Sequence, residues 1–92
     1  MGREPCKIYE KNKLVRLALI GNGVNIGTSC LIAHRVVIAR YVQIGNFTKV
    51  WGNASIRDGV SVGINSVVGM GAVVIRNIPN NQTWIGIPAK KI

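Results

Sequence analysis

The stretch CLIAHRVVIARYVQIG, residues 30–45, contains the only histidine of the 92-residue chain, His34. Imidazole changes its protonation near neutral pH, so His34 is the candidate general base for removing a proton from a nucleophile. Its neighbours in the chain are Ala33 and Arg35, and neither is a carboxylate that would orient the ring. His34 is therefore either a catalytic base without the usual acidic support or an exposed surface residue, and the sequence leaves both interpretations open.

The amino-acid composition limits the classes of molecule that the protein is expected to bind. Twelve lysines and arginines against three acidic residues give a net charge of +9, which favours anionic partners such as phosphates, nucleic acid or acidic lipid. The basic residues are scattered mostly singly, without dense clusters or interleaved aromatic residues, which argues against a nucleic-acid groove. No run of about 18 apolar residues occurs, so no membrane span is expected.

The cysteine and histidine counts argue against a disulfide framework and against a metal site. Cys6 and Cys30 are the only cysteines, and we expect no signal peptide ahead of them. We therefore expect a reducing, cytoplasmic compartment. A zinc site of the three-histidine type is excluded by the single histidine, and the cysteines lack any recognisable ligand spacing.

The elements that position His34 follow from a repeat of six residues. One series of branched aliphatic residues comprises Leu14, Ile20, Ile26, Ile32, Ile38, Ile44, Val50, Ile56, Val62, Val68 and Val74. A second series of small or β-branched residues comprises Ala18, Val24, Cys30, Val36, Val42, Thr48, Ala54, Val60, Ser66 and Ala72. Because side chains alternate along extended backbone, residues of both series point inward, and glycine and asparagine between them favour corners.

A helix cannot use a period of six, whereas a solenoid of short strands laid on successive faces can. We therefore predict an all-β parallel β-helix of a little over three coils over residues 14–78. Residues 1–13 are expected to form an N-terminal cap on the first coil. Residues 79–92 leave the repeat and are expected to form an irregular C-terminal tail that packs on the last coil.

Three sequence motifs indicate which family of β-helix proteins the chain resembles. The segments VVGMGAVV, NIPNN and GIPAKK, together with the repeats, resemble the C-terminal half of hexapeptide-repeat acyltransferases. The resemblance extends over about residues 20–92 and is greatest to sugar O- and N-acetyltransferases of the sialic-acid and bacillosamine type. It implies a left-handed β-helix with three hexamers per coil and a homotrimer. It also implies acetyl-CoA as cosubstrate, bound in the groove between neighbouring β-helices, and a sugar or nucleotide-sugar acceptor.

The resemblance also implies roles for individual residues. The family's catalytic histidine falls on His34, and the glycine whose N–H faces the thioester falls on Gly52. A second family histidine that contacts the cofactor falls on Gln43, whose amide can donate or accept a hydrogen bond. Further cofactor contacts along pantetheine fall on Ile64 and Met70. Phosphate contacts are expected for Lys90, Lys91 and Arg76, for which a solvated basic tail is the alternative.

Three hexamers per coil place residues eighteen apart in one stack with a spacing of about 4.8 Å. The corner column that contains His34 then comprises Arg16, His34, Gly52 and Met70. Its spacing agrees with the positions that the resemblance assigns to the base and the thioester donor. For Gly52, a backbone requirement of the corner is the competing explanation.

The chain departs from the family pattern in ways that favour a different class of function. The acidic residue beside the histidine is missing, and Asp58, the only acid within the repeats, belongs to another corner column. The repeats are about two hexamers shorter than the family's, and the nucleotide-sugar domain is not expected here. A noncatalytic trimeric scaffold is therefore the alternative to an acetyltransferase.

Trp51 points outward and is expected in a subunit interface or beside an acceptor pocket.

Overall fold

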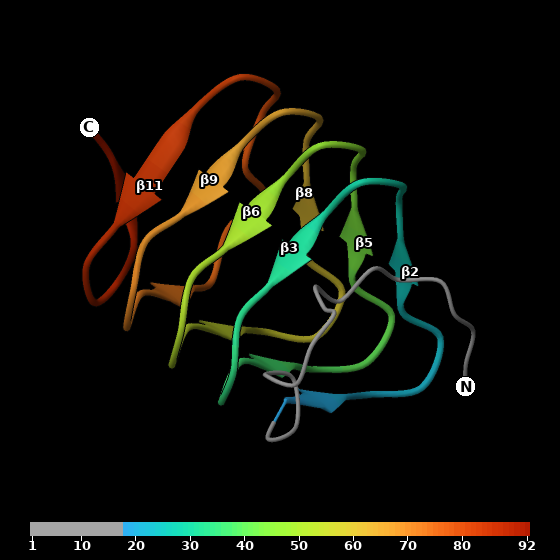
Figure 1. The fold of residues 1–92 in the computed structure, drawn as a ribbon. Coiled ribbons are helices and arrows are strands. Elements are labelled where there is room, and N and C mark those ends of the chain that lie inside the picture. Colours follow the sequence, from blue (N-terminus) through green and yellow to red (C-terminus); the bar gives the residue numbers. More distant parts are fainter. Residues whose placement is uncertain (1–17) are drawn as a thin grey trace.

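The computed structural model describes residues 18–92, so the expected N-terminal cap at 1–13, with Cys6, and the repeat positions Leu14 and Arg16 lie outside the described residues. The described part forms short strands joined by tight corners (Figure 1). It contains no helix long and apolar enough to cross a membrane. The strands are β1 (Leu19–Ile20), β2 (Asn25–Ile26), β3 (Leu31–Ile32), β4 (Val37–Ile38), β5 (Gln43–Ile44), β6 (Lys49–Val50), β7 (Ser55–Ile56), β8 (Ser61–Val62), β9 (Val67–Val68), β10 (Val73–Val74), β11 (Thr83–Ile85) and β12 (Lys90–Lys91).

The strands make three sheets, one on each face of a prism (Figure 1). Their orders are β1-β4-β7-β10, β2-β5-β8 and β12-β11-β9-β6-β3. Within the repeats every pairing is parallel with a register of eighteen residues, as in Leu19 opposite Val37. The parallel β-helix with three hexamers per coil is therefore confirmed. The left-handed winding stays a prediction of the resemblance.

Both six-residue series face the interior, as predicted. From Cys30 to Val74 every member of the two series is buried, and most of them are aliphatic. The members in the first described coil are less covered, and Ile20 is 43% exposed. Each internal coil is covered by a coil above and a coil below, which accounts for the burial of the series within the stack.

Two buried members of the second series are polar, Thr48 and Ser66. The Thr48 hydroxyl donates to the Gly63 carbonyl (2.6 Å) and accepts from the Ser66 N–H (3.2 Å). The Ser66 hydroxyl donates to the Pro79 carbonyl (2.8 Å). The two hydroxyls hydrogen-bond to neighbouring coils, so that neither is left as an unpaired buried donor. Their burial therefore avoids the free-energy penalty of an unsatisfied polar group.

The C-terminal residues extend the solenoid instead of remaining irregular. The register falls from eighteen to sixteen residues, with Ile78 beside Val62 and Thr83 beside Val67. Strand β11 thus continues the β3-β6-β9 sheet in parallel, and β12 returns antiparallel to β11. The chain makes about four turns, slightly more than the sequence indicated. The segment 86–89 lies against β10, where Val73 N–H donates to the Gly86 carbonyl (3.0 Å).

Candidate functional site

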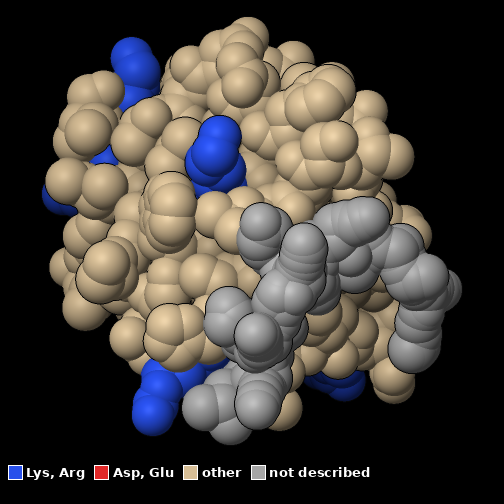
Figure 2. Space-filling model, viewed as in Figure 1, with Lys and Arg blue, Asp and Glu red and all other residues tan. Residues whose placement is uncertain are grey.

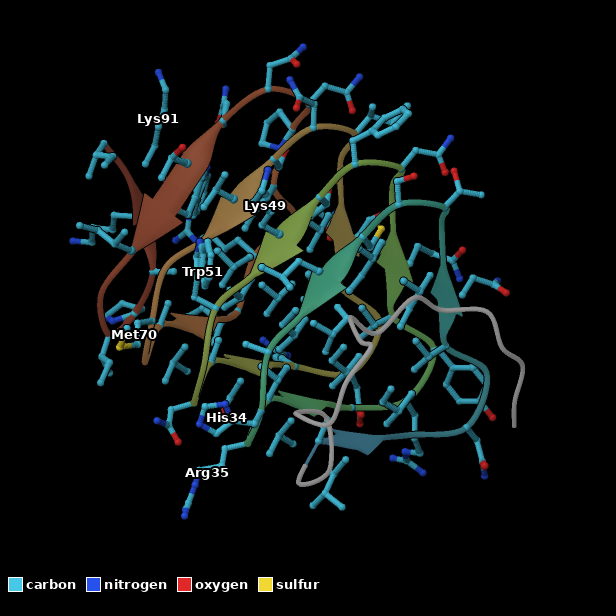
Figure 3. The ribbon with its side chains drawn as sticks, in the orientation of Figure 1. His34, Arg35, Lys49, Trp51, Met70 and Lys91 are labelled. Carbon is cyan, nitrogen blue, oxygen red and sulfur yellow. The ribbon has the colours of Figure 1, made fainter. Side chains whose placement is uncertain are left out.

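His34 lies at the corner between β3 and β4 and is exposed. The Asn53 N–H donates to the His34 carbonyl (3.2 Å), and the Gly71 N–H donates to the Gly52 carbonyl (2.9 Å). These bonds stack His34, Gly52 and Met70 in one column, as the eighteen-residue spacing predicted. Figure 3 shows His34 and Met70 along the same edge of the prism. The backbone of His34 is thus adjacent to that of Gly52 in the next coil, with the His34 carbonyl oxygen 3.4 Å from where a Gly52 Cβ would stand.

The N–H of Gly52 lacks the side-chain acceptor that three N–H groups at comparable corner positions have. At the other two corners three residues donate their N–H to an Asn or Asp side chain one coil later, whereas Asn46 and Asp58 do not. These bonds are Thr28 N to Asn46 Oδ1 (2.9 Å), Arg40 N to Asp58 Oδ1 (2.9 Å) and Ile64 N to Asn80 Oδ1 (2.8 Å). The next residue above Gly52 is Met70, which has no such acceptor, and within residues 18–92 no hydrogen bond takes up the Gly52 N–H. This corner therefore presents a backbone donor one coil from the only imidazole.

The backbone does not require glycine at position 52. Its φ lies outside the left-handed region, and an added Cβ would meet only the His34 carbonyl oxygen, at 3.4 Å. The left-handed positions of this corner are instead Arg35 (φ 64°), Asn53 (φ 64°) and Gly71 (φ 71°). The conformation of the corner therefore does not explain why residue 52 is glycine. Another reason is needed for the lack of a side chain next to this N–H.

No carboxylate of residues 18–92 lies beside His34 in the sequence, and Asp58, their only acidic residue, is held elsewhere. Its Oδ2 accepts from the Arg40 guanidinium (3.1 Å) at the corner between β7 and β8. That hydrogen bond, followed by the one from the Arg40 N–H, lowers the pKa of Asp58. The Arg35 side chain extends outward from the corner near His34 (Figure 3). The described part of the chain thus supplies His34 with a cationic neighbour and no acidic one.

The structure separates the remaining predicted site residues into two groups. Met70 lies with His34 and is 73% exposed, and Lys90 is exposed on β12. Gln43 lies on β5, in the sheet that does not flank the His34 corner, and its Oε1 accepts from Asn25 (3.2 Å). Ile64 lies at the corner between β8 and β9 and is 46% exposed. A single chain therefore does not bring Gln43 or Ile64 to His34.

Two features of the site escaped the sequence analysis. The unpaired N–H of Gly52 could have been found, because Asn or Asp follows one coil after residues 28, 40 and 64 but not after residue 52. Lys49 was also missed, although it precedes Trp51 by two residues and therefore points to the same side of the sheet. No group of three metal-ligating side chains occurs among the described residues.

Comparisons with known proteins agree with the fold. No protein-family model matches the chain. A histidine-to-asparagine mutant of perosamine N-acetyltransferase from Caulobacter crescentus, solved in complex with CoA and GDP-perosamine, superimposes with a TM-score of 0.81 at 31% identity. That match covers 82% of this chain and 36% of the enzyme. The chain resembles the hexapeptide-repeat acyltransferases.

Curated relatives show the same likeness. A probable UDP-3-O-acylglucosamine N-acyltransferase of Arabidopsis thaliana is 35% identical over 85 residues, covering 92% of this chain and 28% of that protein. UDP-3-O-acylglucosamine N-acyltransferase of a Caulobacter species is 27% identical over 85 residues, covering 92% of this chain and 25% of that protein. This hexapeptide-repeat chain thus spans about a quarter of the length of these relatives.

Proposed function

We propose that the chain carries out acetyl-CoA-dependent acetyl transfer to a hydroxyl or amino group of a sugar or nucleotide-sugar, with His34 as the general base. The observation that carries the proposal is the corner where His34, the only histidine, stacks next to Gly52, whose N–H takes part in no hydrogen bond within residues 18–92. The similarity to an N-acetyltransferase solved with CoA and a nucleotide-sugar supports the choice of substrates.

The two groups would divide the chemistry between them. His34 accepts the proton of the acceptor as its oxygen or nitrogen attacks the thioester carbonyl, a contribution of about 10² to 10⁴ in rate. The Gly52 N–H donates to the oxyanion of the tetrahedral intermediate. The intermediate collapses to the acetylated acceptor, and the CoA thiolate leaves with the proton that His34 returns.

A homotrimer would complete the site. Gln43 and Ile64 lie away from His34 within one chain, so they support a groove only if another copy supplies them. A cyclic trimer joins two different faces of neighbouring copies and would bring the β2-β5-β8 face against the His34 corner. Acetyl-CoA would lie in that groove, with Met70 along pantetheine and Lys90 near the phosphates. We expect this assembly in the cytoplasm.

A noncatalytic trimeric scaffold is the second candidate, and one observation favours it. Arg35 stands beside His34 where the resemblance implies an acid, and Asp58 is engaged by Arg40. A scaffold would keep the fold and the trimer without using the imidazole.

The test is acetyl transfer from acetyl-CoA to a panel of amino sugars and nucleotide-sugars, followed as release of free CoA. We expect the wild-type protein to turn over at least one acceptor and His34→Ala to lose most of the rate while keeping its oligomeric state. Unchanged turnover in that variant would end the general-base assignment. A folded trimer that neither binds acetyl-CoA nor transfers acetyl to any acceptor would establish the scaffold.

A further inference from the structure

The corner between β1 and β2 contains the only asparagine–glycine pair of the chain, Asn22–Gly23. In such a pair the glycine nitrogen can attack the side-chain amide of the asparagine, because glycine has no Cβ that hinders the approach. The fold requires glycine here, since φ is 73° and Cδ1 of the Tyr41 ring lies 2.5 Å from where a Cβ would stand. The residue that the corner needs is thus the one that makes the preceding asparagine most reactive.

Most asparagine side chains of residues 18–92 are held by hydrogen bonds. Those that take part in one are Asn25, Asn46, Asn65, Asn77, Asn80 and Asn81. Asn22 and Asn53 are exposed, and their side chains make no hydrogen bond in this part of the chain. The residue after Asn53 is the buried Ala54, whose N–H donates to the Trp51 carbonyl (3.4 Å). Only Asn22 therefore combines an unrestrained side chain with an unhindered nitrogen in the next residue.

The same corner two coils later shows how the fold restrains a similar pair. Asp58–Gly59 lies in the column of Asn22–Gly23, and φ of Gly59 is also 73°. The Gly59 N–H donates to the Arg40 carbonyl (2.9 Å), and Asp58 accepts from the Arg40 N–H (2.9 Å) and guanidinium (3.1 Å). Within residues 18–92 neither the Asn22 side chain nor the Gly23 N–H takes part in a hydrogen bond. Asn22–Gly23 thus lacks both restraints.

We propose that Asn22 is a site of spontaneous deamidation. The Gly23 nitrogen forms a bond to Cγ of Asn22 and loses its proton, and the side-chain amide leaves as ammonia, which gives a succinimide ring. Water then opens the ring at either carbonyl, so position 22 becomes aspartate or isoaspartate. The reaction needs only water and is independent of the proposed acetyl transfer.

Either product places a carboxylate one coil before Arg40, at a strand spacing of about 4.8 Å. Asp58 is the only acidic residue of the described part of the chain, and it already pairs with Arg40 from the other side. Outside its grey region, the face in Figure 2 shows lysine and arginine and no acidic side chain. Deamidation therefore adds a second acidic group to a basic surface, where Arg40 can pair with it.

Isoaspartate also changes the backbone of the corner. The main chain then runs through Cβ and Cγ of residue 22 and is one methylene longer between β1 and β2. The carbonyl of Asn22, which accepts from the Tyr41 N–H (2.9 Å), becomes part of a free carboxylate. We therefore expect the isoaspartyl form to unfold at a lower urea concentration than the aspartyl form, whose backbone is unchanged.

Peptide mapping by mass spectrometry of the incubated protein tests the site. We expect conversion at Asn22 to be faster than at any other asparagine of residues 18–92, with a gain of one negative charge on isoelectric focusing. Asn22→Gln is expected to lose this conversion, because its longer side chain would have to close a larger ring. A synthetic peptide of residues 18–25 gives the rate without the fold. Conversion of the peptide but not of Asn22 in the protein overturns the proposal, as does conversion of Asn53 at the same rate.

Asp58→Asn is the matched control, because it creates the same pair in the same corner with the glycine nitrogen bonded to the Arg40 carbonyl. In the folded variant we expect position 58 to convert more slowly than Asn22 of the same molecule. Equal rates at the two positions would contradict the selection of Asn22 by the missing hydrogen bonds.

Urea unfolding of the separated products tests the effect on the corner, with Asn22→Asp as the reference for the aspartyl form. A lowered midpoint for the isoaspartyl form alone supports the backbone argument. Equal midpoints for the two forms would contradict it.

Discussion

Replacing Gly52 by alanine separates a structural glycine from a functional one. The added Cβ would approach one atom, the His34 carbonyl oxygen, at 3.4 Å, which is ordinary contact, and φ is compatible with alanine. We therefore expect Gly52→Ala to leave the free energy of unfolding unchanged or to raise it by about 0.4–1 kcal/mol, because alanine restricts the unfolded chain. The same methyl group stands beside the N–H that, in the proposed function, donates to the thioester oxygen. Misplacing a reacting carbonyl by about 1 Å costs about a hundredfold in rate.

Gly45→Ala is the matched control for that variant. There the added Cβ would lie 2.7 Å from the backbone carbon of Gly63 and 2.7 Å from the backbone nitrogen of Ile64, and neither atom can move alone. Overpacking of this kind costs about 1–3 kcal/mol, and each 1 kcal/mol lowers Tm by about 4–8 °C in a chain of this size.

Thermal unfolding and acetyl-transfer rates, measured on both variants, give opposite expectations. Gly52→Ala is expected to keep the wild-type Tm and to have a reduced acetyl-transfer rate, whereas Gly45→Ala is expected to have a lowered Tm. A Gly52→Ala protein as destabilised as Gly45→Ala would mean that the corner does need glycine. Full transfer activity in Gly52→Ala would refute the role of its N–H.

Three further variants test other parts of the account. Arg35→Asp places a carboxylate beside His34 in a residue type that tolerates a positive φ, and we expect about a tenfold rise in acetyl-transfer rate near pH 7; an unchanged rate and pH profile would contradict this. Asp58→Asn is expected to lower stability at neutral pH but not in acid. The pKa of Asp58 is lowered by Arg40, so its contribution is present above about pH 4 and is lost as pH falls through the native pKa; equal unfolding curves at pH 7 would contradict it. Thr48→Val leaves a buried N–H without its acceptor, and we expect a loss of about 1–3 kcal/mol in urea unfolding; an unchanged midpoint would refute that.

The repeats could be predicted from sequence because each hexamer repeats the same local physics. Two inward positions in every six residues and a corner between them leave few alternatives to a solenoid. Together with the three hexamers per coil that the resemblance implies, the same regularity predicted that His34 and Gly52 would stack. The burial of Thr48 and Ser66 also followed from their place in the second series, although their hydrogen bonds to neighbouring corners required coordinates.

The C-terminal end could not be predicted because it breaks the repeat. The register shortens by two residues before Ile78, and no local pattern marks that change. Strand β12 pairs antiparallel with β11, a contact set by the end of the stack and not by any period. Gln43 and Ile64 pose a different problem: they lie on other parts of the prism, and one sequence does not specify which faces meet between copies.

The most direct test of the central claim is a calorimetric titration of the whole chain with acetyl-CoA. If the His34–Gly52 corner is an acetyl-transfer site, binding is saturable with about one acetyl-CoA per protomer. Absence of binding by a folded oligomer would contradict the acetyltransferase and leave the corner as part of a scaffold.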